Sequence, residues 1–197
     1  MVEFMSEGVP ALQVDTEDGL GLRVVFVRHV DRYAHRVEIL DGGSVRCCLK
    51  SREGTSDEPW PPSPPLHQLS LEEPAPGRRV ALLLGMAGRS HWSTSVECDP
   101  ASGGLIFDCA CRVQQPPQGL GSCYRADIAI AACTPDRVRL VAEGTAVELE
   151  SLPLAGQRAL TFAQSSGHIE LVERGWAVTR LPSTIRWKYR ITVARCR

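Results

Sequence analysis

Apolar and polar residues alternate along most of the chain in short runs, a pattern typical of half-buried β-strands. No stretch keeps a helical apolar repeat over three turns, so the pattern predicts no long helix. Runs bounded by Gly, Pro and Asp recur at the spacing expected of a β-sandwich or a β-barrel. The alternation therefore predicts an all-β protein, with strands at 22–27, 33–40, 44–50, 67–73, 78–86, 90–98, 105–113, 123–133, 136–142, 146–151, 157–164, 168–173, 176–181 and 184–194.

Tight turns join several of these strands. DGG (41–43), EGT (143–145) and ERG (173–175) each supply a glycine for the positive φ that short hairpin turns require. Strands joined in this way pair antiparallel. We expect an N-terminal segment at 1–20, followed by one antiparallel domain of consecutive hairpins at 21–197. The pattern leaves open whether this domain is a closed barrel or a two-sheet sandwich.

The stretch GTSDEPWPPSPP (54–65) interrupts the alternation and contains five of the 14 prolines. Proline cannot donate to a strand ladder, so this stretch is a loop or a polyproline segment. As a domain linker it would leave only about 50 residues before it, fewer than most stable domains contain. The sequence therefore predicts a long loop inside one domain, with Trp60 covering a sheet face.

The stretch AGRSHWSTSVECD (87–99) resembles an active site in composition, but a β-hairpin accounts for it. Pairing Cys98 with Leu105 places Val96 opposite Phe107, and it continues the alternation along both strands. The same register sets His91 opposite Arg112 and Ser95 opposite Asp108 on the polar face, as expected of cross-strand pairs in water. Ser90 and His91 are adjacent and point to opposite faces, so they do not form a nucleophile and its base.

Composition and charge exclude several classes of protein. The net charge is −1, from 22 basic and 23 acidic residues, so no overall field gathers nucleic acid or anionic lipid. Hydrophobic residues make up 43% of 197, enough for a core without disulfides or a metal. The first residues are acidic where a signal peptide needs a basic start, and no apolar run is long enough to span a membrane. We expect a cytoplasmic protein with no membrane partner.

The eight cysteines are expected to be thiols in a reducing compartment. Cys109 and Cys111 share one face of a strand, which differs from the C-x-x-C turn of a structural zinc site. Cys47 and Cys48 face opposite ways. Because free cysteine packs as a small hydrophobe, filling of the core is the simpler interpretation. The sequence predicts no metal and no cofactor.

Basic residues gather most densely in VRHVDRYAHR (27–36), around Tyr33. Such a cluster suits a phosphate or carboxylate ligand, although Asp31 and Glu38 can neutralise it locally. We predict a ligand site at two clusters. Its candidate residues are Arg28, Arg32, His35 and Arg36, with His91 and Arg112 as the second cluster.

The leading hypothesis is a non-catalytic binding or interaction domain, for a small anionic ligand or a protein partner. One alternative is an enzyme that uses His35 or His91 with Asp108 as acid and base. A second alternative is binding of a nucleic-acid backbone by the basic stripe of 186–190, formed by Arg186, Lys188 and Arg190. The aromatic residues of that strand face away from the stripe, which makes nucleic acid the weaker option. Exposed sheet edges also leave a homodimer open.

Overall fold

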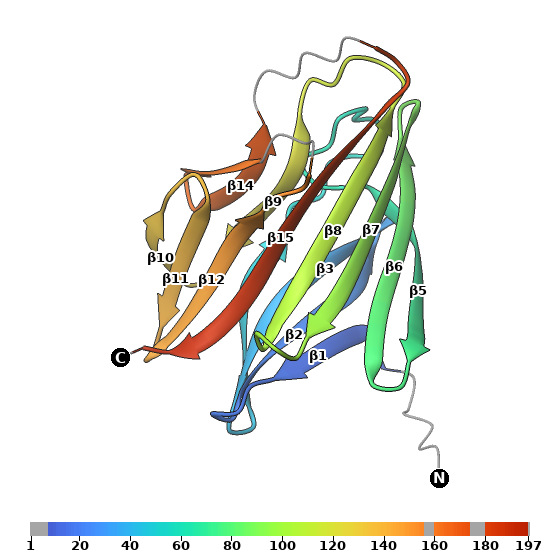
Figure 1. The fold of residues 1–197 in the computed structure, drawn as a ribbon. Coiled ribbons are helices and arrows are strands. Elements are labelled where there is room, and N and C mark those ends of the chain that lie inside the picture. The colour runs from blue at the N-terminus through green and yellow to red at the C-terminus, as the bar shows by residue number, and fades with distance from the viewer. Residues whose placement is uncertain (1–7, 156–159, 174–179, 197) are drawn as a thin grey trace.

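The computed structural model describes residues 8–155, 160–173 and 180–196. Their backbone forms two antiparallel sheets that face each other (Figure 1). No helix occurs within these ranges. The all-β prediction is confirmed, and the architecture is a two-sheet sandwich, because the strands form two separate sheets and do not close into a barrel.

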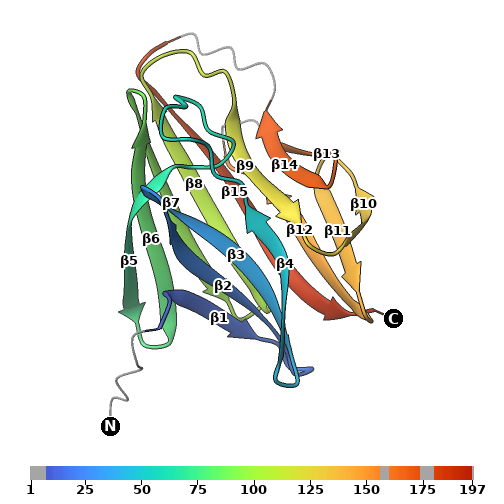
Figure 2. The same cartoon turned by 180° about the vertical axis from the view of Figure 1, so that it is seen from behind.

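Each sheet combines a run of consecutive hairpins with strands from the second half of the chain. Sheet A contains, in spatial order, β1 (Ala11–Asp15), β2 (Leu20–His29), β3 (Arg32–Asp41), β4 (Ser44–Ser51), β9 (Leu120–Ala126), β14 (His168–Glu173) and β13 (Thr161–Ser165). Sheet B contains β10 (Ala129–Cys133), β11 (Arg137–Ala142), β12 (Thr145–Leu152), β15 (Ser183–Arg195), β8 (Gly104–Val113), β7 (Ser90–Asp99), β6 (Arg78–Ala87) and β5 (Leu66–Ala75). Figure 2 shows sheet A in front, with β1 to β4 in consecutive order.

Two of the three predicted glycine turns are confirmed. Gly42 and Gly43, with φ of 54° and 90°, join β3 to β4, which pair antiparallel. Gly144, with φ of 76°, joins β11 to β12 in the same way. Residues with a Cβ rarely adopt these backbone angles, which is why the turns fall at glycine. The third turn, 173–175, lies mainly outside the described residues.

The β7–β8 hairpin has the register that the alternation predicted. Cys98 pairs with Leu105 and Val96 with Phe107, while His91 pairs with Arg112. Val96 and Phe107 are buried in the space between the sheets, whereas His91 and Arg112 are exposed. The polar composition of 87–99 therefore reflects the outward face of a strand.

The proline-rich segment has no strand between residues 52 and 65, and it crosses from β4 in sheet A to β5 in sheet B. Trp60 packs edge-on against Trp92 with ring centroids 6.4 Å apart, and Trp92 packs against Trp187 at 6.1 Å. Buried Ser63 donates a hydrogen bond to the Cys123 carbonyl at 3.0 Å and accepts one from the Cys123 amide at 3.0 Å. The segment is thus a crossing strap fixed to both sheets.

Two features of the chain differ from the sequence prediction, and a third prediction is not tested. The segment before residue 20 contributes β1, which pairs with β2 along its whole length. The single strand expected at 123–133 is wrong: β9 ends at Ala126 in sheet A and β10 begins at Ala129 in sheet B. Asp127 makes the corner, where its amide donates to the Cys48 carbonyl at 3.0 Å. Most of the strand expected at 176–181 lies outside the described residues.

The cysteines form no disulfide, and all eight are free thiols. Cys109 and Cys111 are buried in the core, where burial raises the pKa of each thiol to about 12. Such thiols are inert, because the thiolate is the reactive form. The described residues contain no helix that is long and apolar enough to cross a membrane.

Candidate functional site

The β2–β3 hairpin brings most of the predicted basic cluster to one end of sheet A. His29 pairs with Arg32, and the turn between them consists of Val30 and Asp31. Val30 adopts φ of 56°, a left-handed conformation that a β-branched residue rarely takes. The chain therefore accepts local backbone strain at the turn that positions His29 and Arg32.

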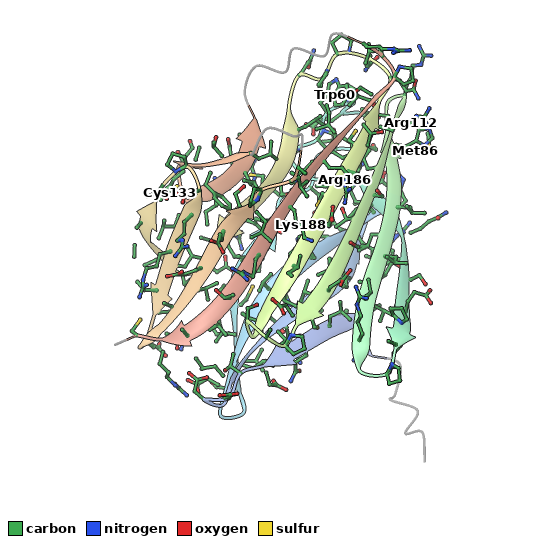
Figure 3. All side chains as sticks on the ribbon, viewed as in Figure 1. Trp60, Met86, Arg112, Cys133, Arg186 and Lys188 are labelled. Atoms are coloured by element: carbon green, nitrogen blue, oxygen red, sulfur yellow. The ribbon has the colours of Figure 1, made fainter. Side chains whose placement is uncertain are left out.

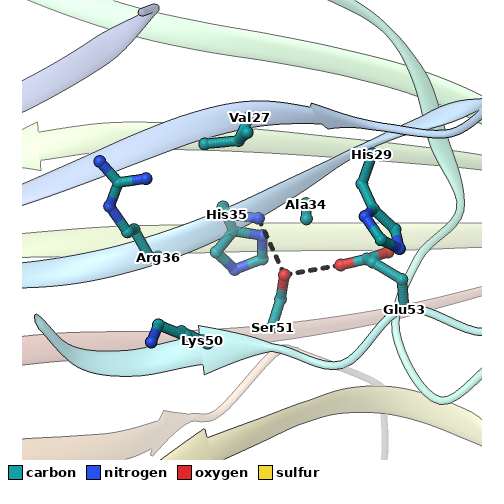
Figure 4. A pocket seen from close by; sticks show the side chains of 8 residues that line it. All are labelled: Val27, His29, Ala34, His35, Arg36, Lys50, Ser51 and Glu53. Atoms are coloured by element: carbon teal, nitrogen blue, oxygen red, sulfur yellow. Dashed lines mark hydrogen bonds between the residues drawn. The ribbon is translucent and has the colours of Figure 1, made fainter. Parts of the chain in front are cut away.

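A cavity of about 300 Å³ opens beside this hairpin, where the ends of β2, β3 and β4 meet (Figure 4). Its volume lies at the lower end of the range typical of small-molecule sites. Apolar and polar side chains line it together. The lining residues are Val27 and His29 from β2, Ala34, His35 and Arg36 from β3, Lys50 and Ser51 from β4, and Glu53, two residues after the end of β4.

Glu53 is the acidic residue that lines the cavity, and only one of its two carboxyl oxygens has a hydrogen-bond partner among the described residues. Ser51 Oγ donates to Glu53 Oε1 at 2.6 Å and accepts from the His35 amide at 2.8 Å (Figure 4). Glu53 Oε2 is buried and has no hydrogen-bond partner among the described residues. Burial raises the pKa of Glu53 to about 7, although the hydrogen bond from Ser51 and the charge of Arg32 act in the opposite direction. This carboxyl group therefore changes its charge near neutral pH.

Arg32 is 2% exposed and pairs with His29, which lines the cavity, and its positive charge acts on the Glu53 carboxyl group. Its Nε and Nη2 donate to the two carboxylate oxygens of Asp31 at 2.9 and 3.0 Å, and Nη2 also donates to the Thr55 carbonyl at 3.2 Å. The hydrogen bonds and charge of Arg32 lower the pKa of Asp31 to about 2. Arg32 Nη1 is buried without a partner in the described parts of the chain.

His35 connects the cavity to the core between the sheets. Its Nε2 lies 2.8 Å from Tyr124 Oη, which lies 2.5 Å from Tyr189 Oη. Phe107 stacks on Tyr189 with a centroid separation of 4.9 Å and also contacts the His35 ring. Burial lowers the pKa of His35 to about 4, so the ring is neutral at pH 7. Its contacts make it a fixed wall of the cavity.

The structure distributes the first predicted cluster over three environments. His35 and Arg36 line the cavity, whereas buried Arg32 is not part of its lining and binds Asp31 and the Thr55 carbonyl. Arg28 does not line it: Nη1 donates to the His67 carbonyl at 2.9 Å, and its guanidinium carbon lies 5.4 Å from the centroid of the Tyr33 ring. The expected local neutralisation occurs in two ion pairs, Arg32 with Asp31 and Arg36 with Glu38.

The second predicted cluster lies on the other sheet. His91 and Arg112 are cross-strand neighbours on β7 and β8, both exposed, and neither lines the cavity. Asp108 is four residues from Arg112 on β8, or about 13 Å of strand. Asp108 also accepts two hydrogen bonds from Arg186, at 3.1 and 2.8 Å. Neither His35 nor His91 meets Asp108 in one pocket, as an acid–base pair requires.

Acidic residues of the neighbouring strands pair with the basic stripe on β15, of which Arg186 and Lys188 are labelled in Figure 3. Asp108 on β8 forms an ion pair with Arg186 at 2.8 Å, and its Oδ2 lies 4.0 Å from Lys188 Nζ. Glu150 on β12 forms an ion pair with Arg190 at 2.6 Å. These pairs leave little unbalanced charge for a phosphate backbone, whose binding depends on neutralising the phosphates.

Sequence reasoning did not select Lys50, Ser51 and Glu53. The only local signal is that Ser51 and Glu53 alternate at the end of a strand just before the proline-rich segment. Nothing in that signal shows that Glu53 is buried, because glutamate is mostly exposed in proteins. Among the described residues, no group of three or more His, Cys, Asp or Glu side chains is arranged to hold a metal ion.

No protein-family model matches the chain, and no curated protein matches it.

Proposed function

We propose that this chain is a non-catalytic binding domain that holds a small anionic molecule in the cavity between β2, β3 and β4. The observation that carries the proposal is the lining of this cavity. Val27 and Ala34 provide apolar surface, and Arg36 and Lys50 provide positive charge beside it. Small-molecule sites combine apolar walls with a few convergent polar groups in this way.

Both cations retain donors for a ligand. Lys50 Nζ contacts Asp127 at 2.6 Å, and its side chain is 43% exposed. Arg36 Nε donates to Glu38 Oε1 at 2.6 Å, and its side chain is 37% exposed. An ammonium group has three donors and a guanidinium has five, so one carboxylate partner does not use all of them.

Thermal unfolding in the presence of small anions tests this proposal. Acetate, benzoate and inorganic phosphate are suitable first probes, each titrated at constant ionic strength. A ligand at about 100 times its Kd adds about 2.7 kcal/mol to the free energy of unfolding, and Tm rises accordingly. Absence of a dose-dependent shift with each of these anions would contradict the proposal.

The two lysines of the chain provide a matched pair of variants. Lys50 lines the cavity, whereas Lys188 lies on β15 near Asp108. Lys50→Met is expected to weaken binding of the anion by about tenfold, the loss of one charge-assisted contact. Lys188→Met is expected to leave the affinity unchanged. Equal effects of the two substitutions would place the ligand elsewhere.

A further inference from the structure

Two buried polar atoms beside the cavity have no hydrogen-bond partner among the described residues: Arg32 Nη1 and Glu53 Oε2. The remaining donors and acceptors of these groups are occupied by Asp31, Thr55 and Ser51. A buried polar atom without a hydrogen-bond partner destabilises the fold, so an arrangement that keeps two of them needs an explanation. Arg32 Nη2 donates to the carbonyl of Thr55, two residues after Glu53, and Arg32 pairs with His29, which lines the same cavity as Glu53, so both side chains belong to this end of the sheet.

A single ligand group that reaches both atoms must accept a hydrogen bond from Arg32 and also match the protonation state of Glu53. Arg32 Nη1 is always a donor, because guanidinium keeps its protons at any physiological pH. Glu53 Oε2 is an acceptor when ionised and a donor when protonated. A carboxylate group of a ligand accepts two hydrogen bonds at once, one from Arg32 and one from protonated Glu53. Ionised Glu53 would instead repel such a ligand across a poorly solvated site.

We propose that the inner end of the cavity binds the carboxylate group of a small organic acid, and that Glu53 takes up one proton from solvent when the acid binds. This inference rests on the proposed function and specifies its ligand. The proton adds to Glu53 Oε2, which then donates to one carboxylate oxygen while Arg32 Nη1 donates to the other. No covalent bond of the ligand changes.

Several other charged or titratable groups face the same space. His29 from β2, His35 and Arg36 from β3, and Lys50 from β4 line the cavity, and Asp31 belongs to the turn. Near pH 7 Asp31 stays ionised, because Arg32 lowers its pKa to about 2, and His35 stays neutral, because burial lowers its pKa to about 4. His29 is the other histidine that lines the cavity, so the test includes a His29 variant.

Isothermal titration calorimetry with pairs of acids and amides tests the inference. The probes are acetate, hexanoate and benzoate, each compared with its neutral amide, from pH 6 to pH 8.5. We expect the acids to bind and the amides to bind at least tenfold more weakly. Affinity for the acids should fall by about tenfold per pH unit above pH 7, where free Glu53 is ionised. Titrations in buffers of different ionisation enthalpy should show uptake of up to one proton.

Substitution of Glu53 identifies the protonated group. Glu53→Gln supplies an uncharged donor of the same shape, so it should retain affinity for the acid while the dependence on pH disappears. His29→Gln should leave that dependence intact. Arg32→Gln should lower the affinity by about tenfold or more at every pH. If Arg32→Gln does not fold, Glu53→Gln alone still decides the inference.

The possible results separate the two proposals. Acids that bind with a pH dependence removed by Glu53→Gln support both. Binding of acids without pH dependence, or a dependence removed by His29→Gln alone, overturns proton uptake at Glu53 and leaves the anion site standing. Binding of phosphate or amides but not acids overturns the carboxylate ligand, and an ordered water between Arg32 and Glu53 then explains the two atoms. No binding of any probe overturns the proposed function itself.

Discussion

Glu38 and Glu53 both have carboxyl groups that are largely shielded from solvent in the β2–β4 region, but they differ in their hydrogen-bond partners. Glu38 is 5% exposed and accepts hydrogen bonds from Arg36 at 2.6 Å and from Arg23 at 2.7 Å. Burial opposes its ionisation, but these two arginines outweigh burial and lower its pKa. Glu53 has only Ser51 as a hydrogen-bond partner among the described residues, and burial raises its pKa to about 7.

The difference separates a structural carboxylate from one that is available to a ligand. The oxygens of Glu38 are taken by arginines of neighbouring strand positions, so its ionised form belongs to the folded state. Glu53 lies two residues beyond the end of β4, where the pairing with β9 has ended, and one of its oxygens has no hydrogen-bond partner among the described residues. Arg36 contacts Glu38 and also lines the cavity that contains Glu53, so the two environments are adjacent.

The largest effect that we expect is on acid stability through His35. Burial lowers the pKa of His35 from 6.5 to about 4. The contribution of the neutral ring to the free energy of unfolding is therefore complete above pH 6.5, and it is lost as the pH falls through 4. The total is about 3 kcal/mol. Urea unfolding between pH 4 and pH 7 should show that the free energy of unfolding rises with pH. The measurement uses the Glu53→Gln variant, because Glu53 lowers the free energy of unfolding as the pH rises over part of that range.

Two histidine variants provide the control for this experiment. His35→Gln should remove the slope, and exposed His91→Gln should leave it. If both variants keep the slope, His35 is not the group that titrates.

Substitutions of the two glutamates should change stability in opposite directions at pH 8. Glu38→Gln removes an acceptor from two arginines and should destabilise the fold by about 2 kcal/mol. The raised pKa of Glu53 means that its contribution is lost as the pH rises through 7, so ionised Glu53 is a cost at pH 8. Glu53→Gln should therefore stabilise the fold by about 2 kcal/mol. Urea unfolding measures both, and destabilisation of similar size by both would remove the distinction.

The smallest effect concerns the paired charges of sheet B. Asp108 binds Arg186 on the outward face, where the arginine side chain is 47% exposed. Asp108→Asn should cost less than about 1 kcal/mol, because exposed ion pairs are weak and screened by salt. The difference from the unsubstituted protein should shrink further in 1 M NaCl. A decrease of more than about 2 kcal/mol in the free energy of unfolding would mean that the Asp108–Arg186 pair contributes as much to stability as the ion pairs of Glu38.

The register of β7 and β8 was predictable because alternation and a glycine-containing turn fix it together: a slip of one residue would turn Val96 and Phe107 outward. β1 escaped prediction, since its five residues lie next to an acidic stretch and give little pattern. The corner at Asp127 escaped for another reason. The alternation of apolar and polar residues continues through Asp127. Only the packing of the two sheets decides where the chain leaves sheet A and enters sheet B.

The site was predictable only in part. His35 and Arg36 belong to a dense basic cluster, and local sequence shows such clusters. Whether a charge is already neutralised depends on distant residues, as Arg28 shows by binding the carbonyl of His67. Glu53 reaches the cavity because the β3–β4 hairpin folds back beside β2, and its burial arises from tertiary structure that no local pattern encodes.

The most direct measurement is an NMR titration of the glutamate side-chain carboxyl carbons in the unliganded protein, with Glu53→Gln and Glu38→Gln used for assignment. The account predicts that Glu53 titrates with a midpoint near pH 7, while Glu38 titrates below its ordinary value of 4.5. A Glu53 midpoint close to 4.5 would show that its carboxyl is fully solvated or paired, and it would contradict both the distinction between the two glutamates and the proton-coupled site.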